Sequence, residues 1–194
     1  SACLVGSEMC IRDRAWSRRE EAVALLEVRA GSPPSATELI VRFRRIDGLD
    51  QLGQLWQDWE VWFANIDETH TSLAPLSFFR SPTPNRSWVT ACGAVLDAAA
   101  LVNAVVAVPH NPRADLCLRA GYVALKNIAR FFRLSFEEHP EPFDAVSVAR
   151  EEFETPACAW LRRGCRSRPI AIGPGATSPV GASTTMRCWL AWRR

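Results

Sequence analysis

The sequence lacks several patterns that mark catalytic or metal-binding chemistry. It has one lysine against 22 arginines, a single tyrosine and three histidines. The seven cysteines are odd in number and form no C-x-x-C pair, so the sequence predicts neither a disulfide framework nor a structural zinc site and favours a reducing compartment. The glycines have no lysine placed as a phosphate-binding loop requires. No run alternates apolar and polar residues over the length of a strand, which excludes a β fold.

No set of residues has the spacing of a catalytic centre. His70, His110 and His139 are scattered along the chain, and the neighbours Asp67 and Glu68 match neither a metal motif nor an acid–base pair. His70 continues an apolar helical stripe, where a histidine is more often a hydrogen-bonded core or cap residue than a ligand or base. We therefore expect no enzyme activity, no cofactor and no metal.

Acidic residues are absent from the last forty positions. Residues 155–194 hold seven arginines and no acid, whereas residues 15–154 hold 14 basic and 19 acidic residues. The formal net charge of +2 thus hides a mildly acidic body, and we expect no nucleic-acid partner. Three tryptophans and three cysteines crowd into this end without a period, as in an out-of-frame translation of a GC-rich gene. We expect a frameshifted, disordered tail at 155–194.

The chain begins without a methionine, and residues 7–14 (SEMCIRDR) resemble translated sequencing-adapter sequence. The alternative is a natural disordered terminus. In either case we expect residues 1–14 to be an artefactual or disordered leader outside the fold.

A long stripe of large apolar residues dominates the middle of the chain. Its members recur at spacings of three and four, which predicts one face of a long helix: Leu49, Leu52, Trp56, Trp59, Phe63 and Ile66. Burying each is worth roughly 1.5–3 kcal/mol, so at least two other elements must pack against the stripe. The sequence predicts an all-α domain over residues 15–154, with five or six helices around this Trp/Phe-rich central helix and disordered ends. The predicted core or pocket residues are Trp56, Trp59, Trp62, Phe63, His70 and Trp88.

Further helices are predicted at residues 15–30, 35–46, 88–108, 113–134 and 143–154. Ser35 has the spacing of a capping box, and Phe78 and Phe79, in a proline-rich connector, are expected to fold back on the core. The nearly all-apolar segment 88–108 is long enough to cross a bilayer. Asp97 near its middle would cost roughly 2.5–3.5 kcal/mol there, so we favour a buried helix and keep a membrane span as the alternative.

A basic strip lies along the predicted helix 113–134, formed by Arg119, Lys126, Arg130 and Arg133. Such a strip is most often a solvated face. The alternative is contact with an anionic membrane surface or an acidic partner, which makes these four residues the candidate partner-facing or membrane-facing set.

Two stretches resemble the cytoplasmic region that follows the pore helices in bacterial two-transmembrane, potassium-channel-like proteins. They are DWEVWFANIDETHTSLAPLSFFRSPTPNRSWVTACGAVLDAAALV (58–102) and RADLCLRAGYVALKNIARFF (113–132). Choosing permitted codons for residues 159–192 and reading them offset by two bases can yield an amphipathic sequence containing GWRVNYD, which resembles the next segment of those proteins. The similarity covers about residues 18–154.

The resemblance implies a non-enzymatic regulatory or assembly domain beneath a potassium pore. The parent protein would lie in the cell membrane with this region in the cytoplasm, and its partners would be the rest of the channel-like protein, further copies of itself and an anionic membrane surface. No T-V-G-Y-G-like filter accompanies Gly121-Tyr122, so this fragment could not conduct ions. The alternative is a free-standing soluble helical protein that binds a small ligand or a protein partner in an aromatic pocket near Trp59, Trp62 and Trp88.

Overall fold

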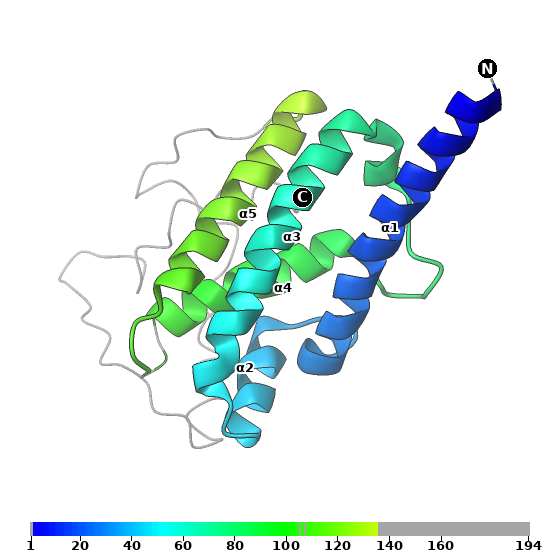
Figure 1. Cartoon of the computed structure of the whole chain (residues 1–194). Helices are drawn as coiled ribbons and strands as arrows, with labels where there is room; N and C mark the ends of the chain where they lie inside the picture. The colour runs from blue at the N-terminus through cyan, green and yellow to red at the C-terminus, as the bar shows by residue number, and fades with distance from the viewer. Residues whose placement is uncertain (1, 105, 107, 136–194) are drawn as a thin grey trace.

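The central apolar stripe forms helix α3, and the other helices surround it in the computed structural model, which describes residues 2–104, 106 and 108–135 (Figure 1). The elements are α1 (Ala2–Ala30), α2 (Ala36–Arg45), the 3-10 helix η1 (Leu49–Gln51), α3 (Leu52–Ser72), the 3-10 helix η2 (Ala74–Phe78), α4 (Trp88–Ala104) and α5 (Pro112–Phe131). Within the described residues there is no strand, and the predicted all-α fold is confirmed.

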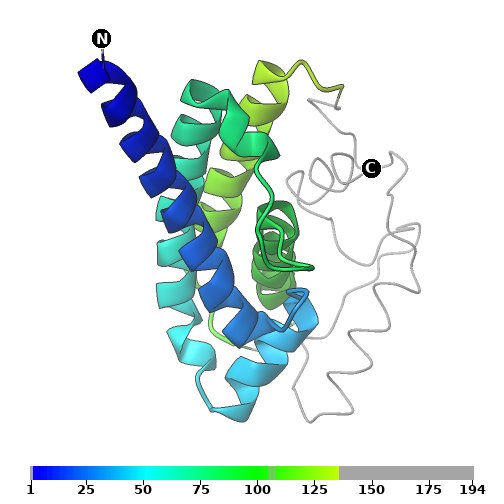
Figure 2. The same cartoon turned by 90° about the vertical axis from the view of Figure 1, so that its right-hand side faces the viewer.

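The helices form two layers. α1, α3 and α5 lie side by side in one layer, and α4 crosses behind them with α2 at its lower end (Figures 1 and 2). α3 buries its predicted stripe between these layers, while its opposite face is exposed at Gln54, Gln57, Asp58, Asn65 and Glu68. The central position of α3 follows from the width of its apolar stripe.

Helices α3 and α5 run parallel and in close contact. The start of each helix lies at the same end, where Arg113 contacts Gln57, and near their far ends Asn127 donates to Asp67 at 2.8 Å. Between these points the chain has no side chain at Gly121, where an added Cβ would lie 2.5 Å from Leu96 and 3.1 Å from Phe63. This glycine therefore sets how closely α5 approaches α3 and α4.

Local sequence signals fix several helix ends. α5 begins as predicted, because the side chain of Asn111 accepts from the backbone N–H of Arg113 at 3.0 Å and Pro112 occupies the first turn. Ser35 precedes α2 with an extended backbone, but its side chain makes no capping hydrogen bond, so the predicted capping box is not formed. α5 ends at Phe131, and Arg133, two residues beyond it, adopts a left-handed φ of 53°.

Residues 2–14, the predicted artefactual or disordered leader, are helical and form the first half of α1. Residues 2–30 contain no proline and only one glycine, so nothing in the backbone ends the helix before Gly31, whose φ is 84°. The predictions for residues 136–194, including the helix at 143–154 and the frameshifted tail at 155–194, lie outside the described residues.

Two further expectations are corrected. Phe78 and Phe79 do not fold back on the core, because 71% and 42% of their surfaces are exposed. The predicted helix 88–108 ends at Ala104, four residues short of its predicted end. Over the part of the chain that the structure describes, no helix is both long and apolar enough to cross a membrane.

Candidate functional site

The six predicted core or pocket residues are all buried: Trp56, Trp59, Trp62, Phe63, His70 and Trp88. The rings of Trp59 and Trp62 lie 4.5 Å apart, and that of Phe63 lies 5.4 Å from Trp62. His70 stacks at 4.9 Å from Trp88, which joins α3 to α4. The structure therefore places these residues in the core, and Trp62 also lines a cleft.

A buried arginine, which the sequence reasoning missed, connects α1 to the end of α3. Arg19 is 2% exposed, and its guanidinium donates to the carbonyl oxygens of Leu76 at 2.6 Å and Phe79 at 2.7 Å. It also pairs with Glu20 at 3.0 Å. Burial lowers the pKa of Arg19, and the Glu20 carboxylate opposes this by raising it. The guanidinium thus links α1 to carbonyl groups of η2 and of the residue that follows it, and the Leu76 carbonyl also accepts from the backbone N–H of Phe79 at 3.2 Å.

His70 belongs to the same network. Arg19 Nη1 lies 3.3 Å from His70 Nε2, and because an arginine only donates, this nitrogen must be the acceptor. The ring hydrogen is therefore on Nδ1, which faces the hydroxyl of Thr69 at 3.1 Å. Burial, together with the positive charge of Arg19, lowers the pKa of His70 from 6.5 to about 4. His70 is thus neutral at pH 7 and fixed in one tautomer.

Sequence spacing did contain a signal for Arg19. It falls on the apolar face of α1 in the series Trp16, Arg19, Val23, Leu26 and Ala30, whose spacing alternates between three and four. A lone charge in such a stripe must find internal partners if the stripe is buried.

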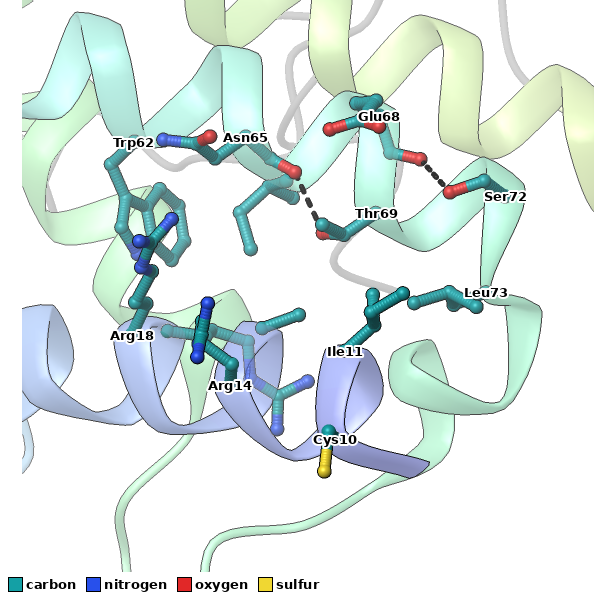
Figure 3. Close-up of a pocket in the computed structure, with 13 residues that line it drawn as sticks. Cys10, Ile11, Arg14, Arg18, Trp62, Asn65, Glu68, Thr69, Ser72 and Leu73 are labelled. Carbon is teal, nitrogen blue, oxygen red and sulfur yellow. Dashed lines mark hydrogen bonds between the residues drawn. The ribbon is translucent and has the colours of Figure 1, made fainter. Parts of the chain in front are cut away.

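A cleft of about 590 Å³ separates the first half of α1 from the second half of α3 (Figure 3). Arg14 and Arg18 line it from α1 and face Trp62, Asn65 and Thr69 on α3. The indole Nε1 of Trp62 is buried without a hydrogen-bond partner among the described residues. Cationic and aromatic groups together suit an anionic aromatic molecule.

The predicted basic strip lies on the outer side and at the end of α5. Arg119 and Lys126 flank the ring of Tyr122, at 5.7 and 5.5 Å from its centre. Arg130 lies in the last turn, and Arg133 follows the helix end. The strip therefore divides into a pair of cations that stack on an aromatic ring and a pair that lies beside exposed phenylalanines.

An exposed group of aromatic and basic residues covers the ends of η2 and α5. We call it the aromatic–basic surface, formed by Phe78, Phe79, Arg80, Arg130, Phe131, Arg133 and Leu134. Phe78 and Phe131 both contact the half-buried ring of Phe132, at 5.2 and 5.0 Å between ring centres. Segments about fifty residues apart in the sequence thus form one continuous patch.

The thiols in the core have no reactive character. Cys92 and Cys117 are buried, and burial raises the pKa of Cys117 to about 12 and that of Cys92 well above its usual value. Across the described helices and loops, no three His, Cys, Asp or Glu residues are arranged to hold a metal ion.

Comparison with known proteins gives no relative from which a role could be carried over. No protein-family model, no curated protein and no solved structure matches the chain.

Proposed function

We propose that this chain is a non-enzymatic regulatory or assembly domain of a bacterial potassium-channel-like membrane protein, lying on the cytoplasmic side and contacting its surroundings through the aromatic–basic surface. That exposed surface is the observation that carries the proposal. Contiguous exposed apolar residues mark interaction sites, and here exposed phenylalanines lie beside arginines.

The use of the potentially reactive side chains supports a binding role over catalysis. His70 is held as a neutral acceptor by Arg19, and Cys92 and Cys117 are buried as thiols. Catalytic groups instead need a pKa matched to the working pH and access to a substrate. These side chains stabilise the fold.

The arrangement of the resembling stretches also supports the proposal. Residues 58–102 supply most of α3, η2 and most of α4, and residues 113–132 supply α5. Through the α3–α5 pair they form a single continuous core, so the resembling stretches belong to one folded domain.

Flanking DNA tests the assignment directly. Two hydrophobic spans around a filter loop, upstream in the same reading frame, are the expected finding. A start codon with a ribosome-binding site just before Ala15 would instead identify a free-standing protein and overturn the proposal.

The full gene product tests the role of the surface. Reconstituted potassium flux, or its regulation, should change in the double variant Arg130→Glu/Arg133→Glu. The matched control is Arg44→Glu/Arg45→Glu, which reverses two exposed arginines at the end of α2. Equal flux from the two double variants would show that the surface takes no part in regulation or assembly.

The cleft beside Trp62 favours a second candidate, a helical protein that binds a small anionic aromatic ligand. Anilinonaphthalene sulfonate fluorescence should then rise with the wild-type chain and fall with Arg18→Glu, but not with Arg80→Glu, because Arg80 is exposed and does not line the cleft. Three lining residues, Cys10, Ile11 and Arg14, belong to the adapter-like segment, which ranks this candidate below the first.

A further inference from the structure

We propose that the chain forms a symmetric dimer through the outer face of the α3–α5 pair, with α3 of each copy packed on α5 of the other. We call this surface the dimer face, formed by Asp58, Val61, Ala64, Leu116, Arg119, Ala120 and Val123. It shares no residue with the aromatic–basic surface, and the inference does not rest on the proposed function.

An apolar strip runs along the seam where α3 and α5 lie side by side (Figure 1). It lies between the two contacts that join these helices, Arg113 with Gln57 and Asn127 with Asp67. Its members are three or four residues apart, so each set lies on one side of its helix: Val61 and Ala64 on α3, and Leu116, Ala120 and Val123 on α5. Val61 is 58% exposed, Leu116 52% and Val123 37%. The two helices therefore fill the core and still leave an apolar row on the surface.

The two helices that carry this strip have opposite charges. α3 contains four acidic residues and no arginine or lysine, whereas α5 contains four cationic residues and one acid. Asp58 flanks the strip on α3, three residues before Val61, and Arg119 flanks it on α5, three residues after Leu116; both are exposed. Gln54 donates to Asp58 at 2.8 Å, and Arg119 stacks over the ring of Tyr122 at 5.7 Å. The dimer face thus has an acidic half and a basic half on either side of an apolar centre.

This division of charge favours a second copy as the partner. A symmetric interface uses the same patch on both copies, so the patch must be complementary to itself. A two-fold axis that lies in the interface, parallel to α3 and α5, places each α3 on the α5 of the other copy. The apolar rows then meet, and Asp58 of one copy lies on the same side as Arg119 of the other, where their charges attract. An axis perpendicular to the helices would instead place acid against acid.

The size of the face is adequate for a dimer. α3 has 21 residues and α5 has 20, so each is about 30 Å long. With a helix diameter of about 10 Å, the pair presents about 600 Å² in projection, and the accessible area of a surface covered by side chains is larger than its projection. A stable interface takes about 800 Å² from each partner. Burial of the α3–α5 face is therefore of the order that a specific dimer requires.

Sedimentation equilibrium of the full chain tests the inference. The wild type should show a monomer–dimer equilibrium that added salt shifts toward monomer, because opposite charges meet across the interface. Val61→Ser/Leu116→Ser should weaken the dimer at least about tenfold, since these side chains lose the burial that association gives them. The matched control is Val28→Ser/Ile46→Ser near α2, at positions 74% and 72% exposed, which should stay within about twofold of the wild type. Thermal unfolding of each variant separates lost association from lost folding.

Charge exchange tests the pairing of α3 with α5. Asp58→Lys and Arg119→Glu should each weaken the dimer at least about tenfold, because both attractive pairs of the dimer become repulsive. An equal mixture of the two variants should form a heterodimer of about wild-type affinity, because one charge pair is exchanged and the other is native. In the control mixture, Arg45→Glu replaces Arg119→Glu, and the Asp58→Lys chain should not regain that affinity.

A monomeric wild type, a dimer that salt strengthens, or a variant mixture without recovery would each overturn the inference. Loss of the dimer in Phe78→Ser/Phe79→Ser, with Val61→Ser/Leu116→Ser unaffected, would also overturn it by placing self-association at the aromatic–basic surface. Each of these results can occur with a pore-coding sequence upstream, so the inference can fail while the proposed function stands. A dimer with the expected charge exchange but no pore-coding sequence upstream would give the reverse.

Discussion

Arg19 is the residue whose removal should cost the most stability among the charged residues that the structure describes. Arg19→Met removes five hydrogen-bonded contacts to four residues and leaves Glu20 buried without its partner, so we expect a loss of about 3–5 kcal/mol in the free energy of unfolding. Urea unfolding measures it. The control is Arg18→Met, one position earlier and exposed, which should cost less than about 1 kcal/mol. Similar losses in both variants would show that the network contributes nothing.

His70 should make stability depend on pH in a definite window. Its folded pKa of about 4 lies below the unfolded value of 6.5, so the unfolded chain binds the proton first. The stabilisation is complete above pH 6.5 and is lost as the pH falls from 6.5 to 4, by up to about 3 kcal/mol.

The variant His70→Gln isolates this contribution. It keeps an acceptor for Arg19 but removes the titration, so its unfolding free energy should fall less steeply than that of the wild type between pH 6.5 and 4. All other titrating groups are shared by the two proteins. Parallel slopes would contradict the assigned protonation state.

At the scale of elements, Gly121 controls the junction of α3, α4 and α5. Gly121→Ala should destabilise by about 1–3 kcal/mol, because the new methyl meets the packed side chains of Leu96 and Phe63. Gly53→Ala is the comparison. Its methyl meets the movable side-chain amide of Asn111 at 2.7 Å, and the gain in helix propensity of about 1 kcal/mol offsets the contact. Thermal unfolding should therefore separate the two variants by several degrees, and equal shifts would contradict this packing.

The end of α5 offers a substitution that should stabilise. Arg133 adopts a left-handed conformation while the backbone N–H of Leu134 bonds the carbonyl of Ala129 at 2.8 Å. Arg133→Gly should raise the free energy of unfolding by about 0.5–1 kcal/mol, since glycine adopts this φ without strain. Arg130→Gly, inside the helix, should lower it by about 1 kcal/mol. Chemical denaturation of both variants tests whether the α5 end is formed as described.

Some elements could be predicted from sequence because local chemistry determines them. The stripe through Trp56, Trp59 and Phe63 needs no tertiary knowledge, and Asn111-Pro112 marks a helix start by itself. Phe78 and Phe79 were predicted wrongly because apolar character alone does not say which side chain the core has room for. Arg19 was missed because a charge was assigned to the surface, although its spacing placed it among buried residues.

The parallel pairing of α3 and α5 was also not predictable. An apolar stripe shows that a helix packs against something, but it names neither the partner nor the direction. The aromatic–basic surface depends on this pairing, because it joins the ends of η2 and α5. Its basic half was readable in the sequence, whereas its aromatic half was assigned to the core.

At the scale of the whole molecule, the accessibility of two buried thiols should show whether α4 and α5 unfold together as parts of one core. Cys92 lies in α4 and Cys117 in α5, and both are 0% exposed. Maleimide labelling followed by peptide mapping should leave both unmodified in the native chain and should modify them together in denaturant, at the global unfolding transition. The exposed Cys10 is the internal control and should react without denaturant. Labelling of Cys117 well before Cys92 would show that α5 detaches separately.

The parallel α3–α5 pair also has an electrostatic consequence for the whole molecule. Antiparallel neighbours cancel their helix dipoles, but α3 and α5 add theirs, and their C-termini place about half an elementary negative charge each at one end, which the antiparallel α1 offsets only in part (Figure 1). Arg130 in the last turn of α5 and the buried Arg19 beside the end of α3 lie at that end. These cations therefore offset the partial negative charge of the two helix ends. Reversing the direction of either helix would remove its contribution to that charge.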